Sequence, residues 1–405
     1  MKVVFVNRFY APDHSATSQM LTDLAVGLAA RGMDIHVVTS RLRYDDPSAL
    51  LAPSERLDGV TVHRVRTSTF GRGGLPGRAV DYMTFYLSAG TRLVSLVRRG
   101  DIVVAMTDPP LISVAAGWAA RLRGAHLVNW LQDVFPEVAA ELGFSVARGF
   151  PGRTLAWLRD GSLRKARANV VLGQRMRDRV SAMNVEASSI ITIPNWADGA
   201  AVRPVPRDAN PLRCEWGLCD RFVVGYSGNM GRAHEFLTLV EAAAVLPDVV
   251  FLFIGGGAQK AQVEAIAAEK GLENLLFKPY QPRERLAESL SVADVHVVTL
   301  RPELEGLVVP SKFYCIAAAG RPTIFIGDPD GEIASDVRAA GCGRCVRQGD
   351  AQQLIAALRE LREDHALLEQ TGKDARRAFE ERYDKPMAID AWHRLLRRVA
   401  ADAGS

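Results

Sequence analysis

The chain has 405 residues, of which 48% are hydrophobic and 24% charged, and its formal net charge is +4 at pH 7. This length exceeds what one hydrophobic core usually serves, so we expect two domains. The small net charge gives no reason to expect a nucleic-acid partner. No segment approaches the roughly 18 to 20 apolar residues that span a bilayer. The five cysteines do not form a disulfide framework, so we expect a cytoplasmic protein.

Short β-branched runs alternate with amphipathic segments along the first half of the chain. MKVVFVNRFY begins with a strand and lacks the apolar core and cleavage site of a signal peptide. A helix is predicted from about Ser18 to Arg31, and Gly32 ends it. Further strands are predicted at DIHVVTS, VTVHRV, DIVVAM, HLVNWL and NVVLG. This alternation predicts a parallel sheet covered by helices.

The second half repeats the pattern. RFVVGYSG and VVFLFIG predict strands, and a helix is expected between them from about His234 to Leu246. Another helix, from about Ala258 to Lys270, precedes strands at LLFKPY, VHVVTL and RPTIFIG. A second doubly wound sheet is therefore expected.

A linker is predicted between the halves at IPNWADGAAVRPVPRDANP, which has four prolines and little periodicity. The predicted fold class is α/β, with two Rossmann-like doubly wound domains that face a central cleft. We expect an N-terminal domain at residues 1–198 and a C-terminal domain at 199–385. The last helix, within residues 386–405, is expected to pack back toward the first domain. Ligands of such sheets bind beyond the carboxyl ends of the strands.

Three glycines follow the first strand of the second half, in GYSGNMGRAHEF. Gly225, Gly228 and Gly231 would let the backbone approach a ligand, and a helix start offers free amides to a phosphate. Arg232 could add a charge-assisted contact. A tight strand-to-helix turn is the alternative, and the glycine spacing leaves both open. For FIGGGAQK, which lacks a complete phosphate-loop motif, we favour a plain turn.

A short helix is predicted to start at Pro310 and Ser311 and to end at Gly320, with Lys312 in its first turn. A cation is disfavoured at this end of a helix dipole, and a bound diphosphate would explain it. Lys278 follows another strand and is expected at the same cleft. Each lysine alone would be interpreted as a solvent-facing residue, whereas basic residues on three loops together favour phosphate.

Two other motifs favour ordinary structure. Asp328 and Asp330 in GDPDGE match the DxD pattern of metal-dependent enzymes, but we favour a turn, with Glu332 as a possible acceptor of a sugar hydroxyl. Cys342 and Cys345 form a lone CxxC motif, which supplies only half of a tetrahedral zinc site. We favour buried small residues at a strand start, and we predict no metal site.

Two loops of the first half carry ionisable side chains. His14 lies in YAPDHSATS, and Asp133 and Glu137 lie in NWLQDVFPE. Any of them could orient or deprotonate an acceptor hydroxyl, and a helix cap is the equal alternative for Asp133. Basic and aromatic residues alternate over residues 64–101 and 148–167. This suits an anionic membrane surface or a phosphorylated lipid acceptor, with solvated helix faces as an equal alternative.

The segments FYAPDHSATSQMLTDLAVGLAARGMDIHVVTS, QDVFPE, IPNWAD, GYSGNMG and VPSKFY, in this order, resemble the retaining glycosyltransferase family 4. More narrowly, they resemble bacterial members that build surface polysaccharides. The resemblance covers nearly the whole chain. It implies the GT-B fold, transfer of a sugar from a nucleotide-sugar donor with net retention, and no required metal or cofactor. We expect a UDP-sugar as donor. The resemblance further implies that the domain at 1–198 binds the acceptor and the domain at 199–385 binds the nucleotide sugar.

The resemblance implies a donor site that includes the glycine loop and the start of the short helix, and we expect it to contain Gly228, Asn229, Gly231, Ser311, Lys312 and Glu332. Arg232 and Lys278 are the implied cationic partners of the diphosphate. With Asp133, they are the residues that we expect to act in catalysis.

This chain departs from the family at one place. Many members have two glutamates eight residues apart, and those positions here hold Leu307 and Cys315. Glu303 and Glu305 lie slightly upstream and Glu332 downstream; each is a candidate to replace the missing contacts, and the sequence leaves open whether any of them does.

We therefore expect a cytoplasmic glycosyltransferase that works at the inner membrane face on a lipid-linked or oligosaccharide acceptor. A GT-B-fold nucleotide-sugar epimerase is one alternative. A non-catalytic sugar-nucleotide-binding component of a polysaccharide assembly complex is another, and the missing glutamates are its best support.

Overall fold

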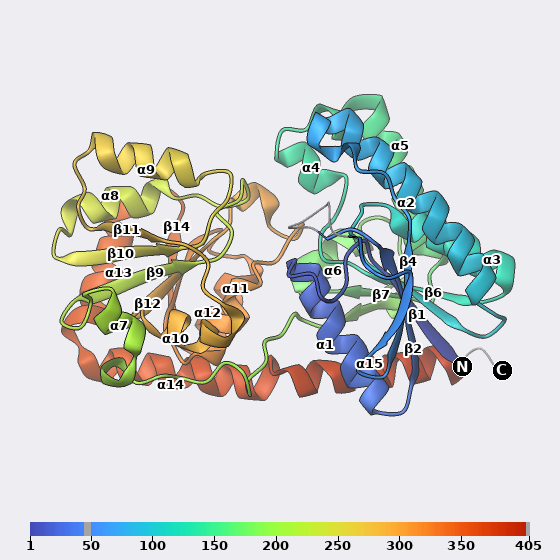
Figure 1. Cartoon of the computed structure of the whole chain (residues 1–405). Coiled ribbons are helices and arrows are strands. Elements are labelled where there is room, and N and C mark those ends of the chain that lie inside the picture. Colours follow the sequence, from blue (N-terminus) through green and yellow to red (C-terminus); the bar gives the residue numbers. More distant parts are fainter. Residues whose placement is uncertain (44–49, 402–405) are drawn as a thin grey trace. The chain divides into compact units, whose positions relative to one another are not determined.

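The computed structural model describes residues 1–43 and 50–401, and the chain divides into two compact units. The first unit contains Met1–Pro194, Gly306–Val308 and the C-terminal stretch from Pro386. The second contains Asn195–Glu305 and Val309–Lys385. Each unit has its own parallel sheet covered by helices (Figure 1). The prediction of two Rossmann-like α/β domains is confirmed. Residues 306–308 belong to the first unit, although the chain before and after them belongs to the second. The predicted division did not include this exception.

The first sheet has eight strands in the order β3-β4-β2-β1-β5-β6-β7-β8. Neighbouring strands are parallel except β3, which forms an antiparallel hairpin with β4 at the edge. In the central pairs, Val4 lies opposite His36 on one side and Val103 on the other. The strands are β1 (Lys2–Val6), β2 (Asp34–Ser40), β3 (Ser54–Leu57), β4 (Val60–Val65), β5 (Ile102–Ala105), β6 (His126–Trp130), β7 (Ala168–Val171) and β8 (Ile190–Thr192).

Helices cover both faces of the first sheet. They are α1 (Ala16–Ala30), α2 (Leu75–Leu96), α3 (Ile112–Arg123), α4 (Glu137–Glu141), α5 (Gly149–Lys165), α6 (Gln174–Ser181) and α15 (Lys385–Ala401). Buried residues of α2 and α3 pack in one cluster with Val4, Val38 and Val103 of the strands. On α15, the ring of Trp392 lies 6.5 Å from that of Phe5 and 4.9 Å from that of Trp130. The end of the chain thus completes the core of the first unit.

The second sheet has six parallel strands in the order β11-β10-β9-β12-β13-β14, which is the doubly wound order of a dinucleotide-binding fold. The strands are β9 (Phe222–Ser227), β10 (Val249–Ile254), β11 (Leu275–Lys278), β12 (Val295–Thr299), β13 (Thr323–Gly327) and β14 (Gly343–Arg347). The residues of the four inner strands, β10, β9, β12 and β13, are almost all buried, because helices cover a parallel sheet on both sides.

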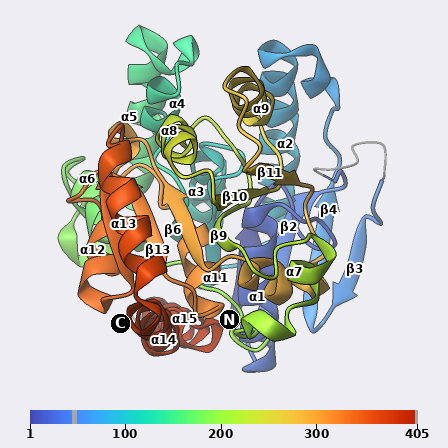
Figure 2. The ribbon, with the colours of Figure 1, turned by 90° about the vertical axis from the view of Figure 1, so that its left-hand side faces the viewer.

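The helices of the second unit are α7 (Pro211–Glu215), α8 (Leu237–Val245), α9 (Lys260–Glu269), α10 (Leu286–Ser291), α11 (Lys312–Ala318), α12 (Glu332–Ala340), α13 (Ala351–Glu363) and α14 (His365–Arg382). Helices α8, α9 and α13 share one apolar cluster on one face of the sheet, and α8 and α13 lie side by side there (Figure 2). Leu212 of α7 belongs to a second cluster, built on the opposite side chains of β9 and β10.

The largest error among the predicted helix starts concerns α8. It begins at Leu237 and not at His234, with Phe236 as its N-cap residue, and the side chain of Glu235 just before the cap satisfies an N–H group of the first turn. The carboxylate of Glu235 accepts hydrogen bonds from the backbone N–H (2.9 Å) and the hydroxyl (2.7 Å) of Thr238. A side-chain acceptor of this kind satisfies helix N–H groups that have no partner within the helix. Residues 228–236 are therefore a loop, which matters for the site.

Among the described residues, no helix combines the length and the apolar character that crossing a bilayer requires.

Candidate active site

The strand order of the second sheet reverses between β9 and β12. At such a reversal the following helices pack on opposite faces, and the loops that leave the two strands diverge around a space where ligands bind. The loop after β9 contains Gly228 to Phe236, and the chain after β12 leads to Lys312 at the start of α11. The predicted donor residues on these two segments therefore belong to one sheet edge.

Two glycine loops pack backbone against backbone at this edge. Gly228 donates to the carbonyl of Ile254 (2.9 Å), and Met230 donates to that of Gly256 (2.6 Å). A Cβ atom at Gly255 would collide with the carbonyl oxygen of Gly228, and one at Gly257 with the side chain of Asn229. The glycines of FIGGGAQK thus support the loop that follows β9.

Lys312 lies against this loop. Its Nζ is 2.9 Å from Nε2 of His234 and 5.2 Å from the centre of the Tyr226 ring. A Cβ atom at Gly228 would lie 2.7 Å from Cε of Lys312, so a side chain at this position would displace the end of the lysine. Three segments thus hold one ammonium group in place: strand β9, the loop after it and the first turn of α11.

The protonation states of this pair follow from their neighbours. Nδ1 of His234 is 2.6 Å from the carbonyl oxygen of Thr299, which can only accept, so Nδ1 carries the proton and Nε2 accepts from Lys312. Burial and the nearby Lys312 lower the pKa of His234 to about 3. Burial lowers the pKa of Lys312 to about 8. At pH 7 a neutral imidazole therefore orients a lysine that is still charged.

The other predicted donor residues are spread along the same unit. Ser311 caps α11 and is exposed, and Arg232 is exposed in the loop after β9. Lys278 ends β11, which is two strands from β9, and its Nζ lies 5.3 Å from the centre of the Trp216 ring. The structure therefore brings Lys312 to the glycine loop and places Lys278 over Trp216.

The three glutamates considered as replacements have different surroundings. Glu303 is 3.6 Å from the guanidinium of Arg301. Glu305 is buried, and its carboxylate accepts from the backbone N–H of Glu332 (2.8 Å), the first residue of α12. Glu305 therefore satisfies the first N–H group of α12, and Glu332 is the first residue of that helix.

The two positions of the missing glutamate pair lie in different units. Cys315 lies on α11, three residues after Lys312, and is half-buried. Leu307 is buried in the first unit, where its carbonyl accepts from the backbone N–H of Val134 (2.8 Å).

The motif GDPDGE forms a turn. Asp328 accepts from the backbone N–H of Asp330 through Oδ1 (2.9 Å) and from that of Gly331 through its carbonyl (3.0 Å). Over residues 1–43 and 50–401, the structure contains no cluster of three or more His, Cys, Asp or Glu side chains arranged to hold a metal ion.

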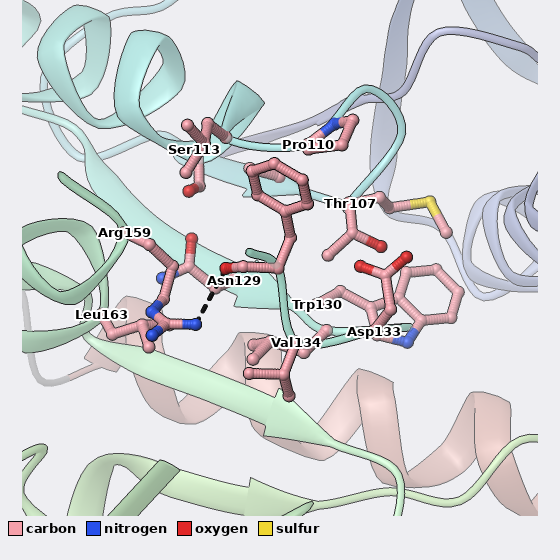
Figure 3. Close-up of a pocket in the computed structure, with 14 residues that line it drawn as sticks. Thr107, Pro110, Ser113, Asn129, Trp130, Asp133, Val134, Arg159 and Leu163 are labelled. Carbon is pink, nitrogen blue, oxygen red and sulfur yellow. Dashed lines mark hydrogen bonds between the residues drawn. The ribbon is translucent and has the colours of Figure 1, made fainter. Parts of the chain in front are cut away.

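In the first unit, Asp133 faces a small cavity of about 30 Å³ at the carboxyl ends of β5 and β6 (Figure 3). Its carboxylate points toward Thr107, which follows β5. The Oδ1 atom of Asp133 is buried without a hydrogen-bond partner among the described residues. Burial, with a smaller contribution from the Asp108 carboxylate, raises the pKa of Asp133 to about 7. Such a group exchanges a proton readily near neutral pH.

Asp108 and Arg8 lie beside this cavity, where the strand order of the first sheet reverses between β1 and β5. The backbone N–H of Arg8 donates to the carbonyl of Asp108 (2.6 Å), and its guanidinium lies 5.0 Å from the centre of the Tyr82 ring. Burial raises the pKa of Asp108 to about 6, and the Arg8 charge opposes the rise.

Glu137 and His14, also predicted on the acceptor side, have other surroundings. Both carboxylate oxygens of Glu137 accept from Arg159, at 2.7 and 2.9 Å. Arg159 also donates to the carbonyl of Phe135 (2.8 Å) on the cavity wall. Glu137 thereby holds α5 to the loop that carries Asp133. His14 is exposed, and its carbonyl accepts from Gln19 (2.6 Å).

Four polar residues of these sites were not predicted from the sequence: Arg8, Thr107, Asp108 and His234. Arg8, Thr107 and Asp108 directly follow β1 and β5, so the rule that ligands bind beyond strand ends could have indicated them. His234 gave no such signal, because its role depends on a carbonyl that is 65 residues away in the chain.

Comparison with protein families assigns both halves. Residues 15–196 match the glycosyl transferase 4-like domain, and residues 216–378 match the glycosyl transferases group 1 domain. Among curated proteins, a putative colanic acid biosynthesis glycosyl transferase of Escherichia coli, WcaI, is 26% identical over 376 residues, which cover 89% of this chain and 92% of the relative.

Solved structures share the fold over the whole chain. Sucrose-phosphate synthase of Thermosynechococcus elongatus superposes with a TM-score of 0.80 at 20% identity, covering 99% of both chains. HepE of Anabaena, crystallised with UDP-glucose, has a TM-score of 0.74 at 17% identity and covers 98% of this chain and 100% of its own. The chain is therefore an enzyme of the group 1 type of glycosyltransferases, with a family 4-like first domain, and it has the GT-B fold.

Proposed function

We propose that this enzyme transfers a sugar with retention from a UDP-sugar to a lipid-linked or saccharide acceptor, in the synthesis of a cell-surface polysaccharide. The second unit would hold the donor and the first unit the acceptor. The similarity to a colanic acid glycosyl transferase supports the pathway class, and the likeness to a fold crystallised with UDP-glucose supports the donor class. No metal ion or cofactor is required in this proposal.

The observation that carries the donor assignment is the Lys312–His234 pair at 2.9 Å. Keeping an ammonium half-buried beside a neutral imidazole is costly unless an anion uses its charge. A diphosphate on the loop of Gly228 would accept from Lys312 and from nearby backbone N–H groups. Because charge develops on the diphosphate as the sugar leaves, a fixed cation there lowers the barrier. In a retaining transfer the acceptor hydroxyl attacks the face from which the diphosphate departs.

The remaining donor residues follow from their positions. Arg232, exposed in the loop after β9, is proposed as a second cation for the diphosphate. Ser311 and Glu332 begin α11 and α12 and are proposed to contact donor hydroxyl or phosphate oxygens. Lys278 remains a proposed donor residue, although its observed contact is with Trp216.

On the acceptor side, we assign Asp133 the role of orienting and deprotonating the acceptor hydroxyl. Its carboxylate lies at the strand ends, half-buried, beside Thr107 and near Asp108. With a pKa of about 7, it can accept a proton in the neutral range. Glu137 acts through Arg159 by holding the wall of the cavity, and His14 is proposed at the acceptor entrance.

The association with an anionic membrane is supported by a surface on α2, α3 and α5. We call it the amphipathic face, and its exposed apolar residues are Val80, Met83 and Leu87 on α2, Trp118 and Leu122 on α3, and Phe150 and Trp157 on α5. The spacing of these residues puts them on one stripe of each helix, and the three helices lie beside one another in the first unit (Figure 1).

Cations surround the amphipathic face. Arg121, Arg153 and Lys165 are exposed on α3 and α5, and Phe150 and Trp157 are 81% and 68% exposed. Exposed aromatic residues flanked by cations suit the headgroup region of an anionic bilayer. The basic stretch 64–101 supplies fewer exposed cations than its composition indicated. Arg64 is buried against Glu55, and Arg92 donates to His63 (2.8 Å).

The donor class is tested by thermal unfolding with UDP, GDP, ADP and CMP, each with and without EDTA. At 100 times its Kd, a ligand stabilises the fold by about 2.7 kcal/mol, which raises the midpoint by several degrees. We expect a rise with UDP that EDTA does not change, and UDP release from a UDP-sugar only when an acceptor is added. Binding without turnover would favour a non-catalytic protein, and sugar conversion without acceptor would favour an epimerase.

Replacement of Lys312 tests the diphosphate site. Lys312→Met should raise the Kd of UDP at pH 7 by about 10- to 100-fold, the scale of one charge-assisted hydrogen bond. In the wild type, the Kd should rise by up to tenfold per pH unit above the Lys312 pKa of about 8, because the ammonium loses its proton there. Titration calorimetry between pH 6.5 and 9.5 measures both. Lys270→Met, on the exposed end of α9, is the control, and an unchanged Kd in Lys312→Met would refute the site.

Replacement of Asp133 separates function from stability. Its folded pKa of about 7 lies above the unfolded value near 3.9, so its contribution to stability is complete below about pH 4 and lost as the pH rises through 7. Asp133→Asn should therefore melt at a higher temperature than the wild type at pH 8, and the difference should shrink as the pH falls below 7. It should also lose about 10² in kcat/KM.

The control is Asp178→Asn, at an exposed carboxylate of α6, which should change neither quantity. An Asp133→Asn variant with wild-type kcat/KM would remove Asp133 from the mechanism.

Vesicle flotation tests the amphipathic face. The wild type should bind vesicles that contain phosphatidylglycerol, and binding should weaken with salt. The double variant Trp118→Ser/Trp157→Ser should bind at least about tenfold more weakly, because it removes more than ~1.4 kcal/mol of apolar transfer. Leu237→Ser, at an exposed leucine of the second unit, serves as the matched control. Equal binding of all three proteins would contradict the assignment.

A further inference from the structure

Two exposed cysteines of the second unit lie in contact. Cys214 is on α7 and Cys219 is in the turn that follows it. Their Sγ atoms are 2.7 Å apart, about 0.65 Å more than the ~2.05 Å of a disulfide bond. Neither residue belongs to the CxxC motif, and neither is in the proposed sugar-transfer machinery.

Two arginines hold the turn between these cysteines. Arg213 is fully buried, and its guanidinium donates to the carbonyl of Leu218 (3.3 Å) and to the carboxylate of Asp294 (2.9 Å). Arg207 donates to the carbonyl of Cys219 through Nη2 (3.0 Å). The backbone carbonyl of Arg213 accepts from Leu218 (2.7 Å). The thiols are therefore brought together by an anchored turn, and a bond between them requires little backbone movement.

The other two cysteines that are close in sequence have different surroundings. Cys342 is buried, and its Sγ donates to the carbonyl of Val337 (3.8 Å), while that of Cys345 donates to the carbonyl of Ala334 (3.5 Å). Burial raises the pKa of Cys342 to about 12. Because the thiolate is the reactive form and needs access to its oxidant, the CxxC pair is protected.

We propose that Cys214 and Cys219 form a reversible intramolecular disulfide by exchange with a small-molecule disulfide such as oxidised glutathione. The thiolate of one cysteine attacks a sulfur of the oxidant, forming a mixed disulfide and releasing one glutathione thiolate. The second cysteine then attacks the protein sulfur of the mixed disulfide and releases the second glutathione thiolate. The two protein thiols lose two electrons and two protons, and two molecules of reduced glutathione receive them.

The closed loop would contain Trp216, whose ring lies 5.3 Å from Nζ of Lys278. Oxidation would therefore fix an aromatic side chain that packs against the end of β11. The chemistry of the pair is independent of the proposed sugar transfer, so its test does not depend on activity.

Peptide mass spectrometry of the full chain tests the proposal directly. Trypsin cuts after Arg213 and Arg221, so Cys214 and Cys219 fall in one peptide, CEWGLCDR, without another cysteine. The reduced protein is equilibrated with an excess of oxidised glutathione and quenched with acid. It is then unfolded in denaturant at neutral pH with iodoacetamide, which alkylates every remaining thiol, and digested. We expect this peptide to be lighter than its reduced form by two hydrogen atoms and to lose both alkylation sites, and dithiothreitol to restore them.

Cys342 and Cys345 fall in separate tryptic peptides and provide an internal control, which should remain alkylated. Cys214→Ser and Cys219→Ser should each leave a single thiol that carries glutathione instead. A wild-type peptide that stays doubly alkylated, that carries glutathione, or that links two chains would overturn the proposal.

Discussion

The candidate sites depend on the reversal of strand order beside the first strand of each sheet. In the second sheet it separates β9 from β12, and in the first it separates β1 from β5. Helices that follow strands on the two sides of the reversal pack on opposite faces, so no helix covers the space between the loops. Polar groups that would otherwise be buried in a parallel sheet can therefore collect there. Lys312 and His234 do so in one unit, and Arg8 and Asp108 in the other.

Partial burial at these edges moves acids and bases toward their neutral forms. The pKa of Lys312 falls to about 8, and that of Asp133 rises to about 7. A charged Lys312 and an ionised Asp133 are therefore both the predominant forms only in the interval between these values. An enzyme that uses the first to hold a leaving diphosphate and the second to accept a proton would be confined to near-neutral conditions by its own packing.

The alternation of apolar runs predicted both sheets, because β-strand and helix periodicities are local properties of the sequence. Lys312 was also predictable, since a cation in the first turn of a helix conflicts with the dipole and calls for a reason. His234 was not, because its tautomer depends on the Thr299 carbonyl of another strand. The same holds for Cys214 and Cys219, whose contact arises from a turn anchored by the buried Arg213.

The position of α15 has a consequence for the order in which the molecule is assembled. Trp392 packs on Phe5 and Trp130, although about 190 residues of the second unit separate α15 from the rest of the first. During synthesis, domains fold as their residues leave the ribosome. The first unit therefore keeps Phe5 and Trp130 uncovered until nearly all of the second unit has been translated. The half of the enzyme that is made first thus cannot complete its core until almost the whole of the other half has been made.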